Sequence, residues 1–583
     1  MYDILISAGT VVDGTNAPAF VADVGISEGR IVAVGRDIGR DARQHIDADG
    51  ALVTPGWVDV HTHYDGQATW DDAMAPSSMN GTTTVIMGNC GVGFAPVAPG
   101  TEQTLIELME GVEDIPGAAL VEGIPWGAWE TFGEYLDHLQ GRTYALDVGT
   151  QIPHGALRFY VMGERGVEGD ATAADRQRQG ELVAEAIDAG ALGFTTSRTI
   201  GHRSLWGEPV PGTFAAHEEL FAIADAMAAL GKGVMEAIPA STIGPLDHLG
   251  GERSTLLEEV AMLSEFSKRS GRPVTFTLVS SSANPSEWQS ILSYVDTANQ
   301  DGASLYPQVP SRPVSVLTGL SSYHAFMRKP TYLEHLAHLP LDQRVREMRK
   351  PDVRTRLLSE QSVVPDAPGS MDNLYGFLTL TASKLIPLHN PVDYLQPQTP
   401  ALGDQAIEEG RDVMEVVYDF LLLDNGSRFA RVSAAEAADT RTIIREMLTH
   451  DATVSGLSDA GAHVTMICDG TMPTTALCDW ARDLPTDEQI PLETVVHMHS
   501  MRNAELYGMV DRGSIAPGKR ADINLIDLDN LQVAPPDPIN DLPAGGTRLI
   551  QPVQGYVATI CDGSVTRRFD EDTGERPGRL VRS

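Results

Sequence analysis

The chain is 583 residues long, 42% of them hydrophobic, and carries a formal net charge of −38. A chain of this length is too long for a single small core and could form several domains, although one α/β barrel can account for most of its residues. The excess of negative charge argues against binding to nucleic acid or to an anionic membrane surface. The sequence has no basic leader, no apolar run of transmembrane length and no framework spacing among its four cysteines. We therefore expect a cytoplasmic protein with reduced thiols.

Both ends of the chain consist of short, strand-like segments separated by tight turns. The first fifty residues include a turn at Glu28-Gly29, and residues 519–527 and 556–563 have the same character. So few short strands cannot bury a core alone, so we expect the two ends to fold together into one small β-sandwich. The predicted sandwich takes residues 1–53 and 508–569, and residues 570–583 follow as a tail.

The middle of the chain alternates between strand-like and helix-like segments. Helical patterns at residues 174–189, 217–231, 255–270 and 286–301 are each followed by a short apolar run. This rhythm indicates parallel β/α units and predicts an α/β fold, a (β/α)8 TIM-like barrel over residues 54–507. The rhythm breaks at about residues 311–440, which we interpret as an insertion over one face.

A His-x-His pair, His61 and His63, follows the apolar run at residues 51–57. Side chains alternate faces along a strand, so both imidazoles point the same way. Two imidazoles at the carboxyl end of a buried strand can grip one metal ion. Many such pairs are instead ordinary core or surface residues.

Two further metal-ligating side chains follow apolar strands. Asp459 can ligate a metal or act as general base toward water, and it also fits the N-cap of a helix. Cys90 lies between Gly88 and Gly91, whose flexibility lets the backbone approach a ligand. Its thiolate would be a zinc ligand, and the alternative is a small buried thiol.

Taken together, these motifs resemble the amidohydrolase superfamily, and more closely the D-aminoacylase (N-acyl-D-amino-acid deacylase) family. The resemblance covers nearly the whole chain apart from the insertion and the tail. The motifs that carry it are Gly-Trp-Val-Asp-Val-His-Thr-His-Tyr-Asp at 56–65, Gly-Thr-Thr-Thr-Val at 81–85, Gly-Asn-Cys-Gly at 88–91, Gly-Ala-Leu-Gly-Phe-Thr-Thr-Ser at 190–197, Ser-Asp-Ala-Gly at 458–461, and residues 511–522.

The resemblance implies a zinc site formed by His61, His63, Cys90 and Asp459. The family also has metal-binding histidines at the ends of strands 5 and 6, where this chain has Glu236 and Leu278. Leucine cannot ligate a metal. Glutamate can do so through oxygen, a hard ligand atom, and would give the site a harder ligand set. One ion is the simplest outcome, and two zinc ions or another divalent metal stay open.

The substrate-facing candidates follow the later strands. An acyl-amino acid carries a carboxylate, which the forked guanidinium of Arg198 or Arg203 would suit. Tyr306 and Arg312 lie near the expected end of strand 7, and ordinary ion pairing is the alternative for each arginine. His463 could orient the Asp459 loop. His497 and His499 are expected to be packing residues.

These observations predict metal-assisted hydrolysis of the amide bond of a small molecule, an N-acyl-(D-)amino acid, in which Asp459 moves the proton. The D preference follows only from the resemblance. One alternative is hydrolysis of another C–N bond, such as a hydantoinase-like reaction on a cyclic amide or on an N-carbamoyl group. Another is a catalytically inactive barrel that acts as a binding protein. Superfamily members often form homo-oligomers, so self-association is also expected.

Overall fold

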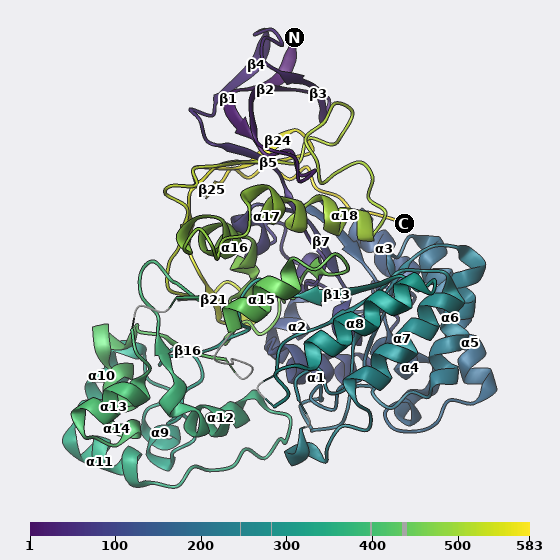
Figure 1. The fold of residues 1–583 in the computed structure, drawn as a ribbon. Coiled ribbons are helices and arrows are strands. Elements are labelled where there is room, and N and C mark those ends of the chain that lie inside the picture. The colour runs from purple at the N-terminus through teal and green to yellow at the C-terminus, as the bar shows by residue number, and fades with distance from the viewer. Residues whose placement is uncertain (245, 282, 397–398, 434–439) are drawn as a thin grey trace.

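The computed structural model describes residues 1–244, 246–281, 283–396, 399–433 and 440–583. Figure 1 shows the N-terminal strands at the top, the parallel strands with their helices below them, and the residues of the predicted insertion at lower left. Among the described residues, no helix is both long and apolar enough to cross a lipid bilayer.

The two ends of the chain share one nine-stranded sheet. The N-terminal β5 pairs antiparallel with the C-terminal β18, which in turn pairs with β23. Ile6, Val24, Ile523 and Ile560 are buried in one core beneath these strands. The pairing confirms that the chain ends associate, whereas a sandwich of two sheets stays a prediction. The strands are β1 (Tyr2–Val11), β2 (Phe20–Ser27), β3 (Arg30–Gly35), β4 (Ala42–Asp47), β5 (Leu52–Pro55), β18 (Ile523–Ile526), β23 (Tyr556–Cys561), β24 (Ser564–Arg568) and β25 (Glu571–Asp572).

The middle of the chain contains two runs of parallel strands. One run has the order β6-β7-β8 and the other β17-β13-β12-β11-β10-β9. A parallel bridge between Thr62 and Ala460 connects the residues that follow β6 and β17. The strands are β6 (Trp57–Asp59), β7 (Thr82–Met87), β8 (Asp147–Thr150), β9 (Ile152–Pro153), β10 (Gly193–Ser197), β11 (Val234–Ile238), β12 (Val274–Thr277), β13 (Leu305–Val309) and β17 (Val454–Ser455).

Four helices alternate with these strands, as the sequence predicts, and their ends have identifiable causes. Capping boxes at Thr172 and Thr255 begin α5 and α7, where each threonine accepts from the backbone three residues on. Gly190 and Gly271 end the same two helices in the left-handed conformation. The helices are α5 (Ala173–Ala189), α6 (His217–Leu230), α7 (Leu256–Ser270) and α8 (Glu287–Gln300), and α1 (Glu102–Glu113), α2 (Gly117–Gly123), α3 (Phe132–Gln140) and α4 (His154–Met162) precede them.

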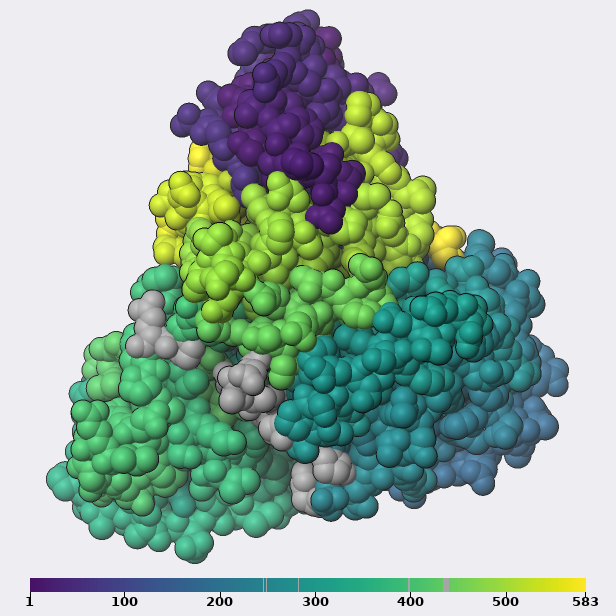
Figure 2. Space-filling view, viewed as in Figure 1, coloured from purple at the N-terminus to yellow at the C-terminus, as the bar shows by residue number. Residues whose placement is uncertain are grey.

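The described part of the predicted insertion packs around its own apolar core, which includes Phe326, Leu357 and Tyr418. Figure 2 shows it as a separate lobe at lower left. Residues 397–398 and 434–439 of the predicted insertion lie outside the described residues. Its elements are β14 (Val316–Thr318), α9 (Pro330–His335), α10 (Leu341–Met348), α11 (Pro351–Ser359), α12 (Leu374–Leu380), β15 (Ile386–Pro387), α13 (Leu402–Glu409), α14 (Val413–Leu421) and β16 (Ala430–Val432).

The chain then returns to the parallel strands through helices α15 (Thr440–Leu448), α16 (Met472–Cys478), α17 (Leu492–His499) and α18 (Met501–Leu506). The C-terminal segment, predicted as a tail, docks on its own chain. Gly578 bridges Tyr144 and Leu580 bridges Val148, the latter within β8. Two short strand pairs complete the described architecture, β19 (Gln532–Val533) with β22 (Val553–Gln554) and β20 (Asp537–Ile539) with β21 (Arg548–Ile550).

A buried ion-pair network joins the parallel strands to the sheet of the chain ends. Asp147, at the start of β8, accepts from Arg512 Nη1 at 2.7 Å and from Arg520 Nη2 at 3.0 Å. It also accepts from the backbone N–H of Arg579 in the C-terminal segment at 2.9 Å. Arg520 reaches the nine-stranded region through Asp522. One carboxylate thus holds three regions of the chain together.

Replacing Asp147 with asparagine should lower the free energy of unfolding by about 1–3 kcal/mol, because two buried guanidinium groups lose the acceptor that they share, while Arg512 keeps Asp511 and Arg520 keeps Asp522. The matched control is Asp137→Asn, which removes the exposed ion pair of Asp137 with Arg582, in which the Asp137 side chain is 76% exposed. That variant should change stability by no more than about 0.5 kcal/mol. Urea denaturation of both variants measures the difference, and equal losses would contradict the role given to Asp147.

Candidate metal centre

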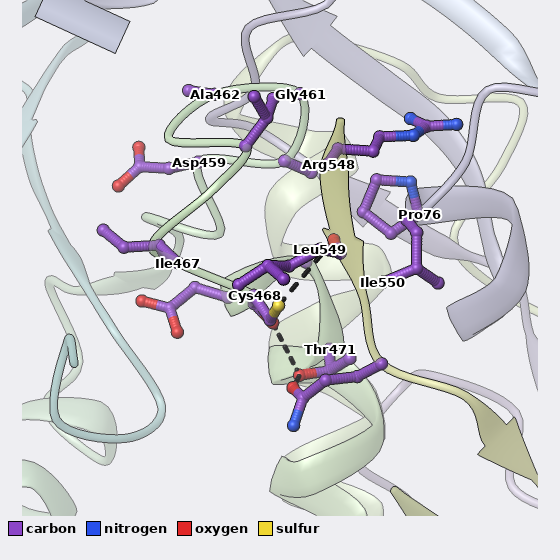
Figure 3. A pocket seen from close by; sticks show the side chains of 15 residues that line it. Pro76, Asp459, Gly461, Ala462, Ile467, Cys468, Thr471, Arg548, Leu549 and Ile550 are labelled. Atoms are coloured by element: carbon purple, nitrogen blue, oxygen red, sulfur yellow. Dashed lines mark hydrogen bonds between the residues drawn. The ribbon is translucent and has the colours of Figure 1, made fainter. Parts of the chain in front are cut away.

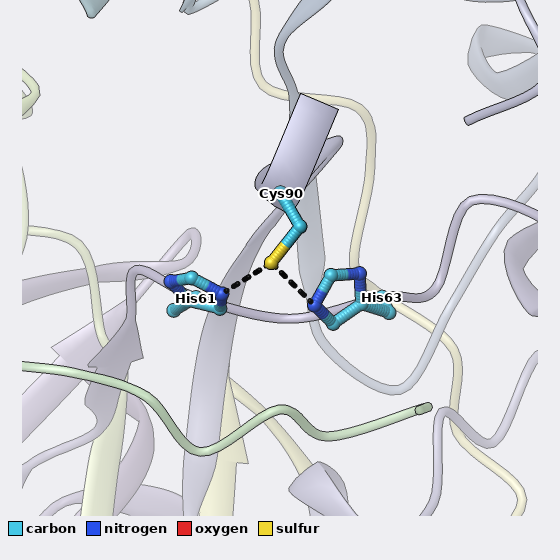
Figure 4. Close-up of side chains that lie close together, drawn as sticks. All are labelled: His61, His63 and Cys90. Atoms are coloured by element: carbon cyan, nitrogen blue, oxygen red, sulfur yellow. Dashed lines mark hydrogen bonds between the residues drawn. The ribbon is translucent and has the colours of Figure 1, made fainter. Parts of the chain in front are cut away.

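Three metal-ligating side chains predicted from the sequence meet beyond β6 and β7. The Sγ atom of Cys90 lies 3.4 Å from His61 Nε2 and 3.7 Å from His63 Nε2 (Figure 4). One ligand atom from each of the three residues falls within 4.8 Å of the others, and all three side chains are buried. This spacing suits a single ion held by two imidazoles and a thiolate.

Asp459 reaches the same point from the loop after β17. Its Oδ1 lies 3.2 Å from His61 Nε2 and 3.6 Å from His63 Nε2. Asp459 and Cys90 therefore face the same atoms, the Nε2 nitrogens with which the two histidines could bind a metal. The N-cap alternative does not apply, because no described helix begins at this residue.

Left-handed backbone conformations are concentrated around this point. Cys90, Leu457, Asp459 and His463 have φ angles of 55°, 64°, 46° and 49°. Non-glycine residues adopt such angles at a cost, and functional sites are where that cost is tolerated. The glycine at position 88 has a packing role, because a Cβ there would lie 2.3 Å from the carbonyl oxygen of Gln151.

Glu236, on β11, lies behind the thiol. Its Oε2 accepts from the backbone N–H of Cys90 at 3.2 Å, and its Oε1 lies 3.9 Å from His61 Nδ1. Oε1 is buried and has no hydrogen-bond partner among the described residues. The side chain thus lies beside the Cys90 backbone and the Nδ1 side of His61, outside the compact group that His61, His63 and Cys90 form. Leu278, at the place of the second missing histidine, is fully buried in the apolar core.

Two residues that the sequence did not point to face the outer nitrogens of the histidines. Gln308, on β13, places Oε1 2.7 Å from His61 Nδ1. An amide oxygen only accepts, so Nδ1 carries the proton and Nε2 keeps its lone pair toward the thiol. Glu113, the last residue of α1, places Oε1 3.5 Å from His63 Nδ1. Such partners orient ligating imidazoles.

Glu113 also belongs to a wider set of contacts. Its other oxygen lies 3.5 Å from His463 Nε2, and its carbonyl accepts from the backbone N–H of His463. The next residue, Asp114, accepts from the hydroxyl of Tyr323 at 2.6 Å and from that of Thr465 at 2.6 Å. Tyr323 lies in the insertion, so the end of α1 contacts the histidines on one side and the insertion on the other.

The acids around the histidines are buried with little positive charge to offset them. Burial raises the pKa of Glu236 to about 8 and that of Glu113 to about 7, and it raises the pKa of Cys90 well above its usual range. Burial opposes ionisation of Asp459 as well, but its contacts with His63 and His61 hold its pKa below its usual range.

The two histidines respond in opposite directions. Burial lowers the pKa of His61 to about 4. Burial also disfavours the cation of His63, but the charges of Glu113 and Asp459 outweigh it and raise the pKa of His63 to about 9. Within the described chain, Glu113, Glu236 and Asp459 form ion pairs only with histidines, and none with lysine or arginine. This excess of buried carboxylate and thiol fits a divalent cation.

A cavity of about 310 Å³ opens onto this cluster. His61, Cys90, Glu113, His202, Asp459 and His463 line its inner end, and Arg312 lines it as well. In Figure 3 the Asp459 carboxylate points away from Arg548 and Leu549, with which Asp459 lines a second, small hollow. The carboxylate therefore faces the large cavity.

Three predicted substrate-binding residues lie elsewhere. Arg198 donates to Glu259 at 2.7 and 3.2 Å, and Arg203 donates to three backbone carbonyls. Tyr306 packs against Val234 and Leu506. None of the three is among the described residues that line the cavity, so their role in binding substrate stays a prediction.

Arg312 is the predicted candidate that the structure places at the cavity. Its side chain is fully buried, and Nη2 donates to Asp469 at 2.9 Å and to Thr471 at 3.0 Å. The guanidinium also lies 3.5 Å over the ring of Tyr394. Nε and Nη1 have no partner among the described residues, so two buried donors remain for a ligand.

The other histidines divide between cavity and packing. His202, which the sequence left without a role, lines the cavity and lies 2.9 Å from the hydroxyl of Ser197. His463 lines it too, beside Asp459. His497 contacts the carbonyl of Gly14, and His499 packs edge-on against Trp57, as expected for packing residues.

The chain belongs to the amidohydrolase family, whose model matches residues 44–567. A D-aminoacylase of Alcaligenes xylosoxydans xylosoxydans is 32% identical over 195 residues, which cover 33% of this chain and only 37% of that relative. Across the full length of both chains, the fold is similar to that of a solved D-aminoacylase, with a TM-score of 0.65 and 22% identity. A Bordetella bronchiseptica N-acyl-D-glutamate deacylase, solved with zinc and a phosphonate inhibitor, also matches fully, with a TM-score of 0.62 and 21% identity.

Removing both histidines should abolish zinc binding. We expect about one zinc ion per wild-type chain and none in His61→Ala/His63→Ala, because three-ligand anchoring fails without the imidazoles. Mass spectrometry of the purified proteins measures the metal. His335→Ala/His338→Ala, which changes two exposed histidines of the insertion, is the control and should keep its zinc. Equal zinc in both double variants would contradict this site.

Replacing Glu113 with glutamine should weaken zinc binding about 10- to 100-fold, because the amide no longer orients His63 through a charged acceptor. Competition with a chelator of known affinity measures the change. Glu107→Gln, on the same helix, changes a carboxylate that accepts from the side chain of Gln103, and it should leave zinc affinity unchanged. An unaltered affinity in Glu113→Gln would show that His63 does not depend on this carboxylate.

Proposed function

We propose that this chain is a metal-dependent hydrolase that cleaves the amide bond of N-acyl-(D-)amino acids, giving a carboxylic acid and a free amino acid. The observation that carries the proposal is the convergence of His61, His63, Cys90 and Asp459 on one point at the inner end of a cavity. Family membership and the similarity to D-aminoacylases support it. The D preference rests on that similarity alone.

The two runs of parallel strands are proposed to form one closed (β/α)8 barrel. Counting β8 and β9, which only Gln151 separates, as one strand gives eight. The Thr62–Ala460 bridge brings the residues after the first and last strands together. In such a barrel, the ends of several strands supply catalytic residues to one face. The positions of His61, Cys90, Glu236 and Asp459 agree with that arrangement.

His61, His63, Cys90 and Asp459 would hold the metal, and Glu236 lies beside them against the backbone of Cys90. A zinc ion in such a site supplies a Lewis acid, which polarises an amide carbonyl and makes water more acidic. The two imidazoles serve as ligands and not as bases, since a nitrogen that binds a metal has no free lone pair. Gln308 orients the ring of His61 through a hydrogen bond, and Glu113 places a carboxylate 3.5 Å from the outer nitrogen of His63.

Asp459 is proposed as the group that moves the proton. Its carboxylate stays ionised at neutral pH, because its pKa is held low, and it lines the cavity. It accepts the proton of the attacking water and then delivers it to the leaving nitrogen, so that the amine departs neutral. Arg312 is proposed to bind the substrate carboxylate through Nε and Nη1, which have no partner among the described residues.

An Asp459→Asn variant should keep its fold and lose at least about 100-fold in kcat, because asparagine cannot accept the proton. Hydrolysis of N-acetyl-D-methionine, N-acetyl-L-methionine and a hydantoin measures both the loss and the substrate class. Asp451→Asn, an exposed aspartate just before β17, is the control. Full turnover by Asp459→Asn would exclude its role, and turnover of the hydantoin alone would favour the cyclic-amide alternative.

A further inference from the structure

The cavity has two ends of different chemistry. The inner end carries the histidines and acids of the candidate metal centre, whereas much of the remaining wall is aliphatic. Ile238 ends β11, Leu457 follows β17, and Ile444 and Met447 lie on α15. Val279, Val314 and Val316 line the same wall and are each only half-buried. Aliphatic side chains left partly uncovered inside a cavity indicate an apolar ligand group.

The mouth of the cavity extends this apolar surface. Ile243, in the loop after β11, lines the cavity and is 55% exposed. An isoleucine that solvent reaches at a cavity entrance can cover the outer part of a long ligand. The remaining outer wall is completed by neutral hydroxyl groups, including those of Thr242, Ser280 and Ser281.

Arg312 is the only lysine or arginine among the described residues that line this cavity. Residues 245, 282 and 434–439, which lie outside the described set, include no lysine or arginine in their sequence either. Arg312 donates to Asp469 through Nη2, and Nε and Nη1, which no described residue contacts by a hydrogen bond, can bind one ligand carboxylate. A second carboxylate on the same ligand would be buried against aliphatic side chains without a counter-charge, which is strongly unfavourable.

We propose that this site selects monocarboxylate amides with a large apolar acyl group or side chain, and rejects N-acyl amino acids with an acidic side chain. This selection rests on the proposed function, because it assigns the substrate class of the same cavity. Arg312 binds the single carboxylate of the substrate, and the residues at the strand ends bind its amide. The aliphatic wall contacts its apolar group. Discrimination of this kind comes from the unpaired charge of the rejected ligand.

The first test measures binding without turnover, so it does not depend on catalysis. Hexanoate and adipate have the same chain length but one and two carboxylates, and both are titrated calorimetrically into the zinc-loaded full chain. We expect hexanoate to bind at least about tenfold more tightly. Equal binding, or tighter binding of adipate, would overturn the proposal.

The second test compares kcat/KM for N-acyl-leucine and N-acyl-aspartate, each as both enantiomers, with the same acyl group. A leucine preference of at least about tenfold supports the proposal, and an aspartate preference overturns it. If neither amide is hydrolysed while hexanoate is still preferred over adipate, the apolar subsite stands and the proposed amidase function fails. The two failures are thereby distinguishable.

A positive charge placed in the wall should weaken the selection. Ile243→Lys adds a second cation at the mouth, where its exposure makes the change compatible with folding, and should bring adipate binding at least about fivefold closer to hexanoate binding. Ile407→Lys adds the same charge at an isoleucine that is 82% exposed on α13 and does not line the cavity. Equal effects of the two variants would show that general electrostatics, and not this wall, sets the preference.

Discussion

The concentration of negative charge around two buried histidines is the constraint on which the rest of the site depends. Asp459, Glu236, Glu113 and the thiol of Cys90 all lie within contact distance of the two imidazoles or of one another. A protein interior does not tolerate so many acids without compensation. The histidines supply part of it, and a divalent cation would supply the remainder. Stability and chemistry are therefore coupled at this one place.

Parallel strands make that concentration geometrically possible. Their carboxyl ends face the same way, so one residue from each of several strands can approach a common point. Glu236 and Gln308 lie within β11 and β13, and Asp459 lies just past β17. The strained φ angles at Cys90 and Asp459 turn these side chains inward where a regular strand would not.

The sequence carried much of this site because its central residues follow recognisable strands. The two-residue period places His61 and His63 on one face, and the apolar runs before Cys90 and Asp459 place both at strand ends. Glu113 could not be predicted in this way, because it ends a helix and meets His63 only through the tertiary fold. Arginine was the least predictable residue type. Its long side chain pairs with an acid that the tertiary fold brings near. Arg198 therefore pairs with Glu259, whereas Arg312 lines the cavity.

The alternation of helices and strands was likewise readable, because capping residues and apolar runs are local signals. The pairing of β5 with β18, far apart in the sequence, was inferred only from the shared character of the two ends. The docking of the C-terminal segment on β8 had no such signal. It depends on backbone bridges at Gly578 and Leu580, and the side chains of these residues do not predict such bridges.

The end of α1 has a consequence for how this architecture can change during evolution. The insertion has its own apolar core and so resembles a module that could be exchanged between relatives. Yet Tyr323 binds Asp114, whose neighbour Glu113 supports His63. A variant that kept every strand but replaced the insertion would remove the Tyr323 partner of Asp114. It would thereby weaken the contacts next to Glu113, the residue that faces His63. The insertion and the candidate metal centre are thus connected through two consecutive residues at the end of α1.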